Sequence, residues 1–176
     1  MNLELCSQYY LKALDYYPHN LESTIENLQY ALSYNPDHPQ ALCMLGQIHM
    51  FYLKDYALAK SCFQQSLAAD INYPDHIKYL GVLYVWLGEY KSAEKLVDFA
   101  WKLPGHSKES LLRIKAMMYE YQRDFDRAKI ILERAQLISQ SKECITNMKA
   151  DLSRIKDKQK QLKKSRKQKK QDKILV

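Results

Sequence analysis

The sequence predicts an all-α protein, and three observations support this fold class. Four glycines and five prolines in 176 residues are too few for a protein built of many short strands and tight turns. Small and apolar residues recur at steps of 34 or 35 residues. Within one period the apolar residues fall at helical spacing, as at Leu80, Leu83, Tyr84 and Leu87. Each period is therefore expected to fold as one helical hairpin.

The repeat is clearest in two columns of aligned positions. The second helix of each unit carries small residues at Thr24, Ala59, Ala93 and Ala128. The first helix, about twelve residues upstream, carries the column Lys12, Gly46, Gly81 and Ala116. Small residues let paired helices approach closely, and large neighbours such as Phe63 and Tyr90 fill the space around the crossing.

Residues 79–105, YLGVLYVWLGEYKSAEKLVDFAWKLPG, resemble a tetratricopeptide repeat. They contain Leu-Gly, an aromatic residue three positions later, Gly-x-Tyr at the inter-helix turn, two spaced alanines and a terminal proline. Residues 41–74 and 110–140 match less fully, and residues 5–38 match loosely. The resemblance implies a right-handed superhelical solenoid of about four tetratricopeptide-repeat hairpins. The expected array spans residues 1–140, with hairpins at about 5–38, 39–73, 74–108 and 109–140.

The individual units depart from this pattern in order along the chain. The first unit has Lys12 where a small residue is preferred and is interpreted as a distorted N-terminal cap of the array. The second unit carries one extra residue in its inter-helix turn, within MFYLKDY. Three residues that precede first helices are expected to cap them with side-chain oxygens, and these are Asp37, Asp75 and Ser107.

A further helix is expected after the array. Ile145, Met148, Leu152 and Ile155 form an apolar stripe, so residues 141–156 are predicted to be a C-terminal capping helix that closes the stack. Residues 157–176 form a basic extension, either a solvated helix or a disordered tail. The last 24 residues carry eleven Lys or Arg and two Asp, which leaves the rest of the chain nearly neutral.

The composition excludes several classes of protein. No stretch approaches the roughly 18 apolar residues that cross a bilayer, and the first residues do not resemble a signal peptide, so a cytoplasmic protein is expected. The cysteines show no zinc-site spacing, His38 and His76 are not expected to share a metal, and no cofactor is expected. The known catalytic and nucleotide-binding fingerprints are missing from the sequence, so the chain is not expected to be an enzyme.

The resemblance implies that partners bind on a concave face lined by the first helix of each unit. The expected lining consists of Tyr9, Tyr10, Tyr16, Tyr17, Met44, Gln47, Met50, Phe51, Lys78, Tyr79, Val82, Trp86, Arg113, Met117 and Tyr121. A groove rich in aromatic residues and methionine suits an apolar peptide or amphipathic helix of another protein. We therefore expect a non-catalytic protein-interaction scaffold, adaptor or chaperone-like module. The competing interpretation is that these aromatic residues only pack between neighbouring helices.

Three further interpretations concern the partner. Some family members clamp a C-terminal carboxylate with Lys, Asn and Arg side chains, and this clamp is missing because the corresponding positions hold Tyr9, Ala13, Met44, Asp75 and Tyr79. The alternative function is binding of nucleic acid or an anionic surface through the tail residues Lys163, Lys164, Arg166, Lys167, Lys169 and Lys170, with the repeats as a mount. The tail could equally be a solubilising segment. A homo-oligomer is also open, in which Ile174, Leu175 and Val176 of one copy enter the groove of another.

Overall fold

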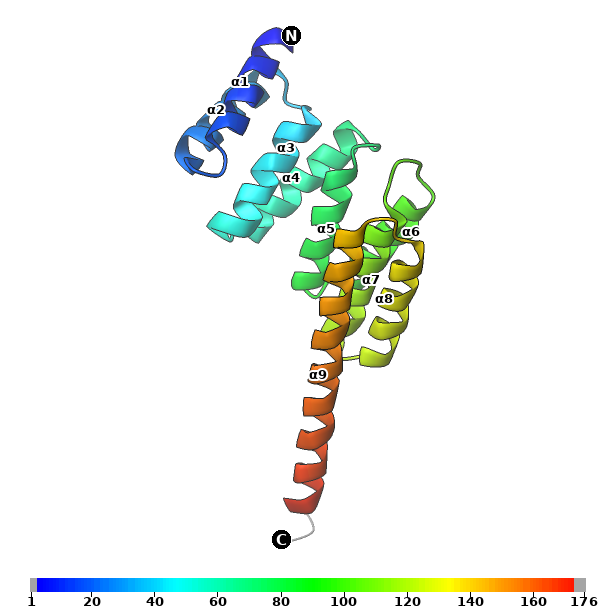
Figure 1. Ribbon diagram of the computed structural model, residues 1–176. Helices are drawn as coiled ribbons and strands as arrows, with labels where there is room; N and C mark the ends of the chain where they lie inside the picture. The colour runs from blue at the N-terminus through cyan, green and yellow to red at the C-terminus, as the bar shows by residue number, and fades with distance from the viewer. Residues whose placement is uncertain (1–2, 173–176) are drawn as a thin grey trace.

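The computed structural model describes residues 3–172, with side chains described as far as Ser165 (Figure 1). Within this part of the chain all regular structure is helical. The order of elements is α1 (Leu3–Tyr16), α2 (Leu21–Tyr34), α3 (Pro39–Ile48), the π-helical turn η1 (His49–Leu53), α4 (Tyr56–Ala69), α5 (Pro74–Trp86), α6 (Tyr90–Trp101), α7 (Lys108–Tyr121), α8 (Phe125–Ile138) and α9 (Lys142–Asp172). None of the described helices is long and apolar enough to cross a bilayer.

Successive helices pair into four hairpins, α1 with α2, α3 with α4, α5 with α6, and α7 with α8. The hairpins follow one another from the N-terminal end of the molecule, and α9 lies beside the last of them and extends beyond it (Figure 1). The predicted fold class, an all-helical repeat solenoid, is confirmed.

The small residues of the repeat lie where helices cross. Ala59, Ala93 and Ala128 are buried. Gly46 of α3 faces α4 so closely that an added Cβ atom would lie 2.7 Å from Cε1 of the fully buried Phe63. The first hairpin differs from the predicted column, since Lys12 is exposed and its neighbour Ala13 takes the buried position.

The helix caps correct two of the three sequence predictions. Ser107 caps α7, and its Oγ accepts a hydrogen bond from the backbone N–H of Ser110 at 3.1 Å. Asp37 and Asp75 are not caps. Proline is favoured in the first turn of a helix, so α3 and α5 begin at their prolines and the cap positions fall on His38 and Tyr73. Asp75 instead lies in the first turn of α5 and accepts a hydrogen bond from the Tyr73 hydroxyl at 3.1 Å.

The extra residue of the second unit is accommodated at the end of α3. Residues His49–Leu53 form a π-helical turn, in which the helix widens and takes up one more residue than an α-helical turn. The turn ends at Lys54 in the left-handed region, with φ 58°. Gly88 and Arg123 occupy the same place in the next two hairpins, with φ 74° and 61°. These three inter-helix turns therefore all contain a left-handed residue two positions before the second helix, despite the extra residue.

Helix α9 packs on the last hairpin through its predicted stripe. Met148, Leu152 and Ile155 are buried in one cluster with Leu132 and Ala135 of α8. The helix then continues without a break to Asp172, so the first of the two expected forms of the basic extension, a helical continuation, is the one described, and Leu162 extends the contact.

Candidate functional site

Side chains of the first helices form a line of contacts from one hairpin to the next. The hydroxyls of Tyr17 and Tyr52 lie 3.4 Å apart, the rings of Phe51 and Trp86 lie 5.8 Å apart, and Arg154 pairs with Glu120. Each pair is separated by 34 or 35 residues, so the same register is repeated along the array. We call this surface the first-helix face, and it comprises Tyr17, Phe51, Tyr52, Lys78, Tyr79, Val82, Trp86, Arg113, Met117, Glu120, Asp151, Arg154 and Lys158.

The middle of the first-helix face is aromatic. The Phe51 ring meets Tyr79 edge to face at 5.9 Å and Trp86 at 5.8 Å, with interplanar angles of 77° and 86°. Tyr79 also stacks on the buried Phe63 at 5.9 Å. Edge-to-face pairs bring the positive ring edge to the negative ring face, which fixes the orientation of each ring. Trp86 nevertheless stays 37% exposed, so the cluster is both ordered and accessible.

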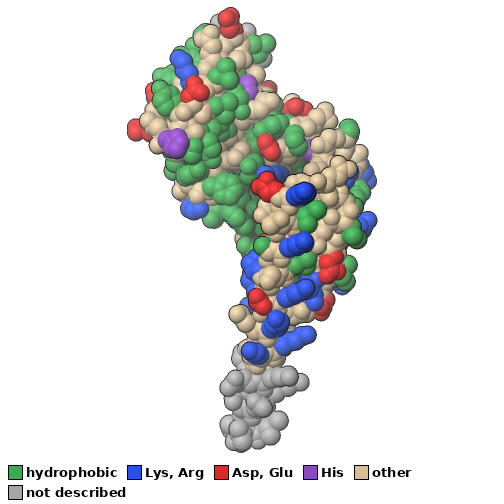
Figure 2. All heavy atoms as spheres, in the orientation of Figure 1, with side chains coloured by type: hydrophobic (Ala, Val, Ile, Leu, Met, Phe, Trp, Pro, Cys, Tyr) green, Lys and Arg blue, Asp and Glu red, His purple; other side chains and the backbone are tan. Residues whose placement is uncertain are grey.

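The C-terminal part of the first-helix face contains a pocket of about 270 Å³ between α5, α7 and α9. Its apolar lining includes Val82, Ile114, Met117 and Ile155, and its polar lining comprises Lys78, Ser110, Arg113, Glu120, Asp151 and Arg154. In Figure 2, hydrophobic side chains cover much of the N-terminal half, whereas Lys and Arg side chains follow α9. The surface therefore changes from aromatic to charged along the array.

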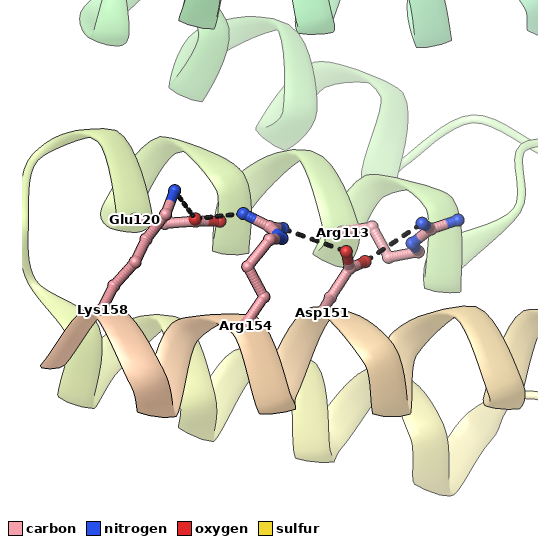
Figure 3. Close-up of polar contacts among 5 residues, drawn as sticks. All are labelled: Arg113, Glu120, Asp151, Arg154 and Lys158. Carbon is pink, nitrogen blue, oxygen red and sulfur yellow. Dashed lines mark hydrogen bonds and ion pairs between the residues drawn. The ribbon is translucent and has the colours of Figure 1, made fainter. Parts of the chain in front are cut away.

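A chain of ion pairs joins α7 to α9 at this pocket (Figure 3). Arg113 Nη2 lies 3.2 Å from Asp151 Oδ2, and Arg154 Nη2 lies 3.0 Å from Asp151 Oδ1. Arg154 also pairs with Glu120, whose Oε1 accepts from Lys158 Nζ at 2.7 Å. The Glu120 side chain is only 3% exposed, so its charge depends on these two partners for compensation. The network therefore joins α9 to α7 along one wall of the pocket.

The repeated hairpin geometry agrees with the known proteins to which the chain is similar. The second hairpin, residues 39–71, matches the family model described as a tetratricopeptide repeat. This hairpin is therefore similar to a tetratricopeptide repeat. The chain is also similar to the solved structure of a MamA RS-1 ArsTM double mutant, with a TM-score of 0.62 and 11% identity over 89% of this chain and 97% of that chain. A tetratricopeptide repeat protein from Parabacteroides merdae ATCC 43184 matches with a TM-score of 0.48 and 16% identity over 88% of this chain and 75% of that one. No curated protein matches the chain.

The structure places most of the expected lining residues at least partly on the surface. These are Tyr9, Tyr10, Tyr16, Tyr17, Gln47, Phe51, Lys78, Tyr79, Val82, Trp86, Arg113, Met117 and Tyr121. Met44 and Met50 require correction, because they are only 7% and 0% exposed and lie in the hydrophobic core. Met44 packs with the first hairpin, and Met50 lies inside the π-helical turn, where α-helical register no longer gives the direction of a side chain.

The predicted site residues do not form one surface. Tyr9 stacks on Tyr34 of α2 at 5.8 Å, so its ring is engaged within the first hairpin. Tyr10 lies against His38 at 4.9 Å, and burial raises the pKa of its hydroxyl. In the tail, Lys163 and Lys164 are exposed, and the side chains of Arg166, Lys167, Lys169 and Lys170 lie outside the described residues.

The charged wall on α9 was not among the predicted site residues. The apolar stripe of α9 predicts a capping helix and does not by itself assign a binding role to Asp151, Arg154 or Lys158. The sequence does contain a signal for the position of Arg154, since it follows Glu120 by 34 residues, which is one of the two steps of the repeat. The same step therefore places Arg154 at the first-helix position of a fifth unit.

A buried histidine lies away from the first-helix face, between α4 and α5. His76 is fully buried, and its Nδ1 lies 3.2 Å from Ser66 Oγ. The Ser66 hydroxyl donates to the carbonyl of Pro39 at 2.8 Å, so the ring nitrogen Nδ1 must donate to Ser66 and Nε2 carries the lone pair. Burial, together with the nearby His106, lowers the pKa of His76 to about 4. The ring is therefore neutral and structural at neutral pH.

Groups that could hold a metal ion do not gather anywhere in the described part of the chain. Burial raises the pKa of the Cys43 thiol to about 12 and that of Cys62 to about 11. These thiols are protonated at neutral pH and therefore poor nucleophiles.

Proposed function

We propose that this helical-repeat protein is a non-catalytic scaffold that binds a segment of another protein on the first-helix face. The repeat architecture supports this proposal in general terms, because stacked hairpins form an extended surface that suits partner binding. The partner segment is a peptide or amphipathic helix, since the aromatic part of the face offers apolar contact area along several hairpins.

One observation carries the proposal, namely the exposure of the ordered aromatic cluster. Phe63 is fully buried and serves the core of the second hairpin. Phe51 and Tyr79 are half-buried and Trp86 is exposed, although Trp86 contacts both Phe51 and Tyr56. Preorganised tryptophan and tyrosine side chains are typical of binding hot spots, because they bury a large area and lose little conformational entropy. The exposed ring area of these residues is therefore available to a partner.

The test compares two tryptophan variants of the full chain in affinity capture from source lysate. Trp86→Ala removes the centre of the proposed site, and Trp101→Ala is the matched control, because Trp101 is also 37% exposed but lies at the end of α6. We expect a protein partner that is retained by the wild type and by Trp101→Ala and is lost with Trp86→Ala. Equal retention by both variants contradicts the proposed site.

The basic extension supports a second candidate function. Lys163 and Lys164 are exposed on a helix that is 31 residues long, so a row of cations projects beyond the hairpins. Such a row would bind nucleic acid through its phosphates, with an affinity that falls steeply as salt rises. Capture that is lost after nuclease treatment and is unaffected by Trp86→Ala would favour this function over the protein scaffold.

A further inference from the structure

We propose that the partner segment is acidic: a large apolar side chain enters the pocket between α5, α7 and α9, and neighbouring Asp or Glu carboxylates pair with the basic rim. This inference rests on the proposed function and specifies the chemistry of the protein that is bound. It concerns the pocket beside the aromatic cluster.

The size and lining of the pocket fit one anchoring side chain. Its volume of about 270 Å³ lies below the range of roughly 300–1,000 Å³ that is usual for small-molecule sites. Val82 and Met117 form an apolar lining from two successive first helices, and Ile155 adds the side of α9. Val82 and Met117 remain only partly buried, and methionine adapts its shape to what it contacts. An aromatic or leucine side chain would bury this surface.

The rim of the pocket carries an excess of positive charge. Three cations, Lys78, Arg113 and Arg154, and two carboxylates, Asp151 and Glu120, line it. Both carboxylates are already engaged, Asp151 by two arginines and Glu120 by Arg154 and by Lys158 from the adjoining part of α9. Lys78 is therefore the lining cation that the network leaves without a carboxylate.

Lys78 is the cation best placed to receive a carboxylate. It is exposed, it lines the pocket, and it forms no ion pair with any described side chain. Its Nζ lies 5.0 Å from the centre of the Tyr79 ring, at the junction of the pocket and the aromatic cluster. The nearby Asp75 accepts a hydrogen bond from the Tyr73 hydroxyl and lines a neighbouring pocket.

The arrangement discriminates by charge. A partner carboxylate near Lys78 and Arg113 would gain a charge-assisted hydrogen bond beside an apolar surface from which water is displaced. A basic segment would bring like charge to the same rim and would be disfavoured.

The experiment is selection from a displayed library of random peptides on the full chain at about 0.15 M salt, where long-range attraction is largely screened. We expect enriched peptides to carry a large apolar residue flanked by Asp or Glu. Their affinities, measured by fluorescence anisotropy, should fall at least about tenfold with Lys78→Glu and less with Lys78→Gln. Lys163→Glu is the matched control, because it makes the same charge change on the exposed part of α9 and should leave affinity within about twofold.

The outcomes separate this inference from the proposed function. Peptides that depend on Trp86 but show no acidic excess overturn the acidic specificity and leave the scaffold function standing. Acidic peptides that lose affinity equally with Lys163→Glu also overturn the inference, because the tail rather than the pocket would bind them. A selection that yields no peptide dependent on Trp86 or Lys78 contradicts both.

Discussion

The buried His76 predicts a loss of stability in mild acid. An unfolded histidine has a pKa near 6.5, and burial together with His106 lowers the folded value to about 4, against the weaker opposing effect of Asp70 and Asp75. Between these values the unfolded chain binds more protons than the folded chain, so the free energy of unfolding falls as pH falls. The contribution is fully present above about pH 6.5 and is lost toward pH 4.

The magnitude follows from the size of the shift. One unit of pKa corresponds to about 1.4 kcal/mol, so the whole transition is worth roughly 3 kcal/mol, of which about 2 kcal/mol is lost by pH 5. The physical cause is the unpaired Nε2 atom, which would acquire a proton and a charge inside the core.

The assay is urea unfolding followed by circular dichroism at about pH 7.5 and about pH 5. His76→Asn cannot titrate in this range, and its amide can still donate to Ser66, so its stability should fall by about 2 kcal/mol less than that of the wild type over the same interval. His19→Asn, at an exposed position, is the control and should keep the pH dependence of the wild type. The reasoning is refuted if His76→Asn loses as much stability as the wild type.

Three further predictions concern stability and use thermal and urea unfolding. Gly46→Ala should destabilise by about 1 kcal/mol, because the clash with the buried Phe63 outweighs the helix preference of alanine. Gly81→Ala should cost less, because its Cβ atom would meet Ile114 at the longer distances of 3.0 Å (Cδ1) and 3.2 Å (Cγ2); the reverse order would contradict the crossing geometry. Arg123→Gly should stabilise by up to about 1 kcal/mol by relieving its left-handed backbone, and a loss of stability would refute this. Glu120→Ala should cost about 2 kcal/mol, less than a fully buried pair, because its cationic partners are half exposed and can turn to water; an effect within experimental error would show that the network does not hold α9.

Much of the fold could be predicted because the repeat imposes the same packing requirement four times. The small residues Ala59, Ala93 and Ala128 align only in one register, and that register fixes where each hairpin begins and crosses. The caps were harder to predict, since several residues before each helix can accept a hydrogen bond. The position of proline decided between Asp37 and His38, because proline lacks an N–H group and suits the first turn.

The candidate site was less predictable because side-chain direction depends on local geometry. Met50 was assigned to the groove on the assumption of a regular α-helix, and the π-helical turn instead places it in the core. The charged wall of α9 depends on contacts between α7 and α9, and sequence alone does not show which of many lysines and arginines will meet Glu120. The exposure of Trp86 could be predicted, because its register places it on the surface of a regular first helix.

The π-helical turn at His49–Leu53 lets the second repeat contain one extra residue without changing the orientation of the helices that follow. Each residue added to an α-helix rotates everything after it by about 100°. An insertion within α3 would therefore turn the following hairpin away from its neighbours and break the line of contacts that runs to α9. The widened turn confines that rotation to a single bulge, so α4 still packs closely on α3 at Gly46 and Phe63. The array can thus change in length by one residue without transmitting a twist to the rest of the molecule.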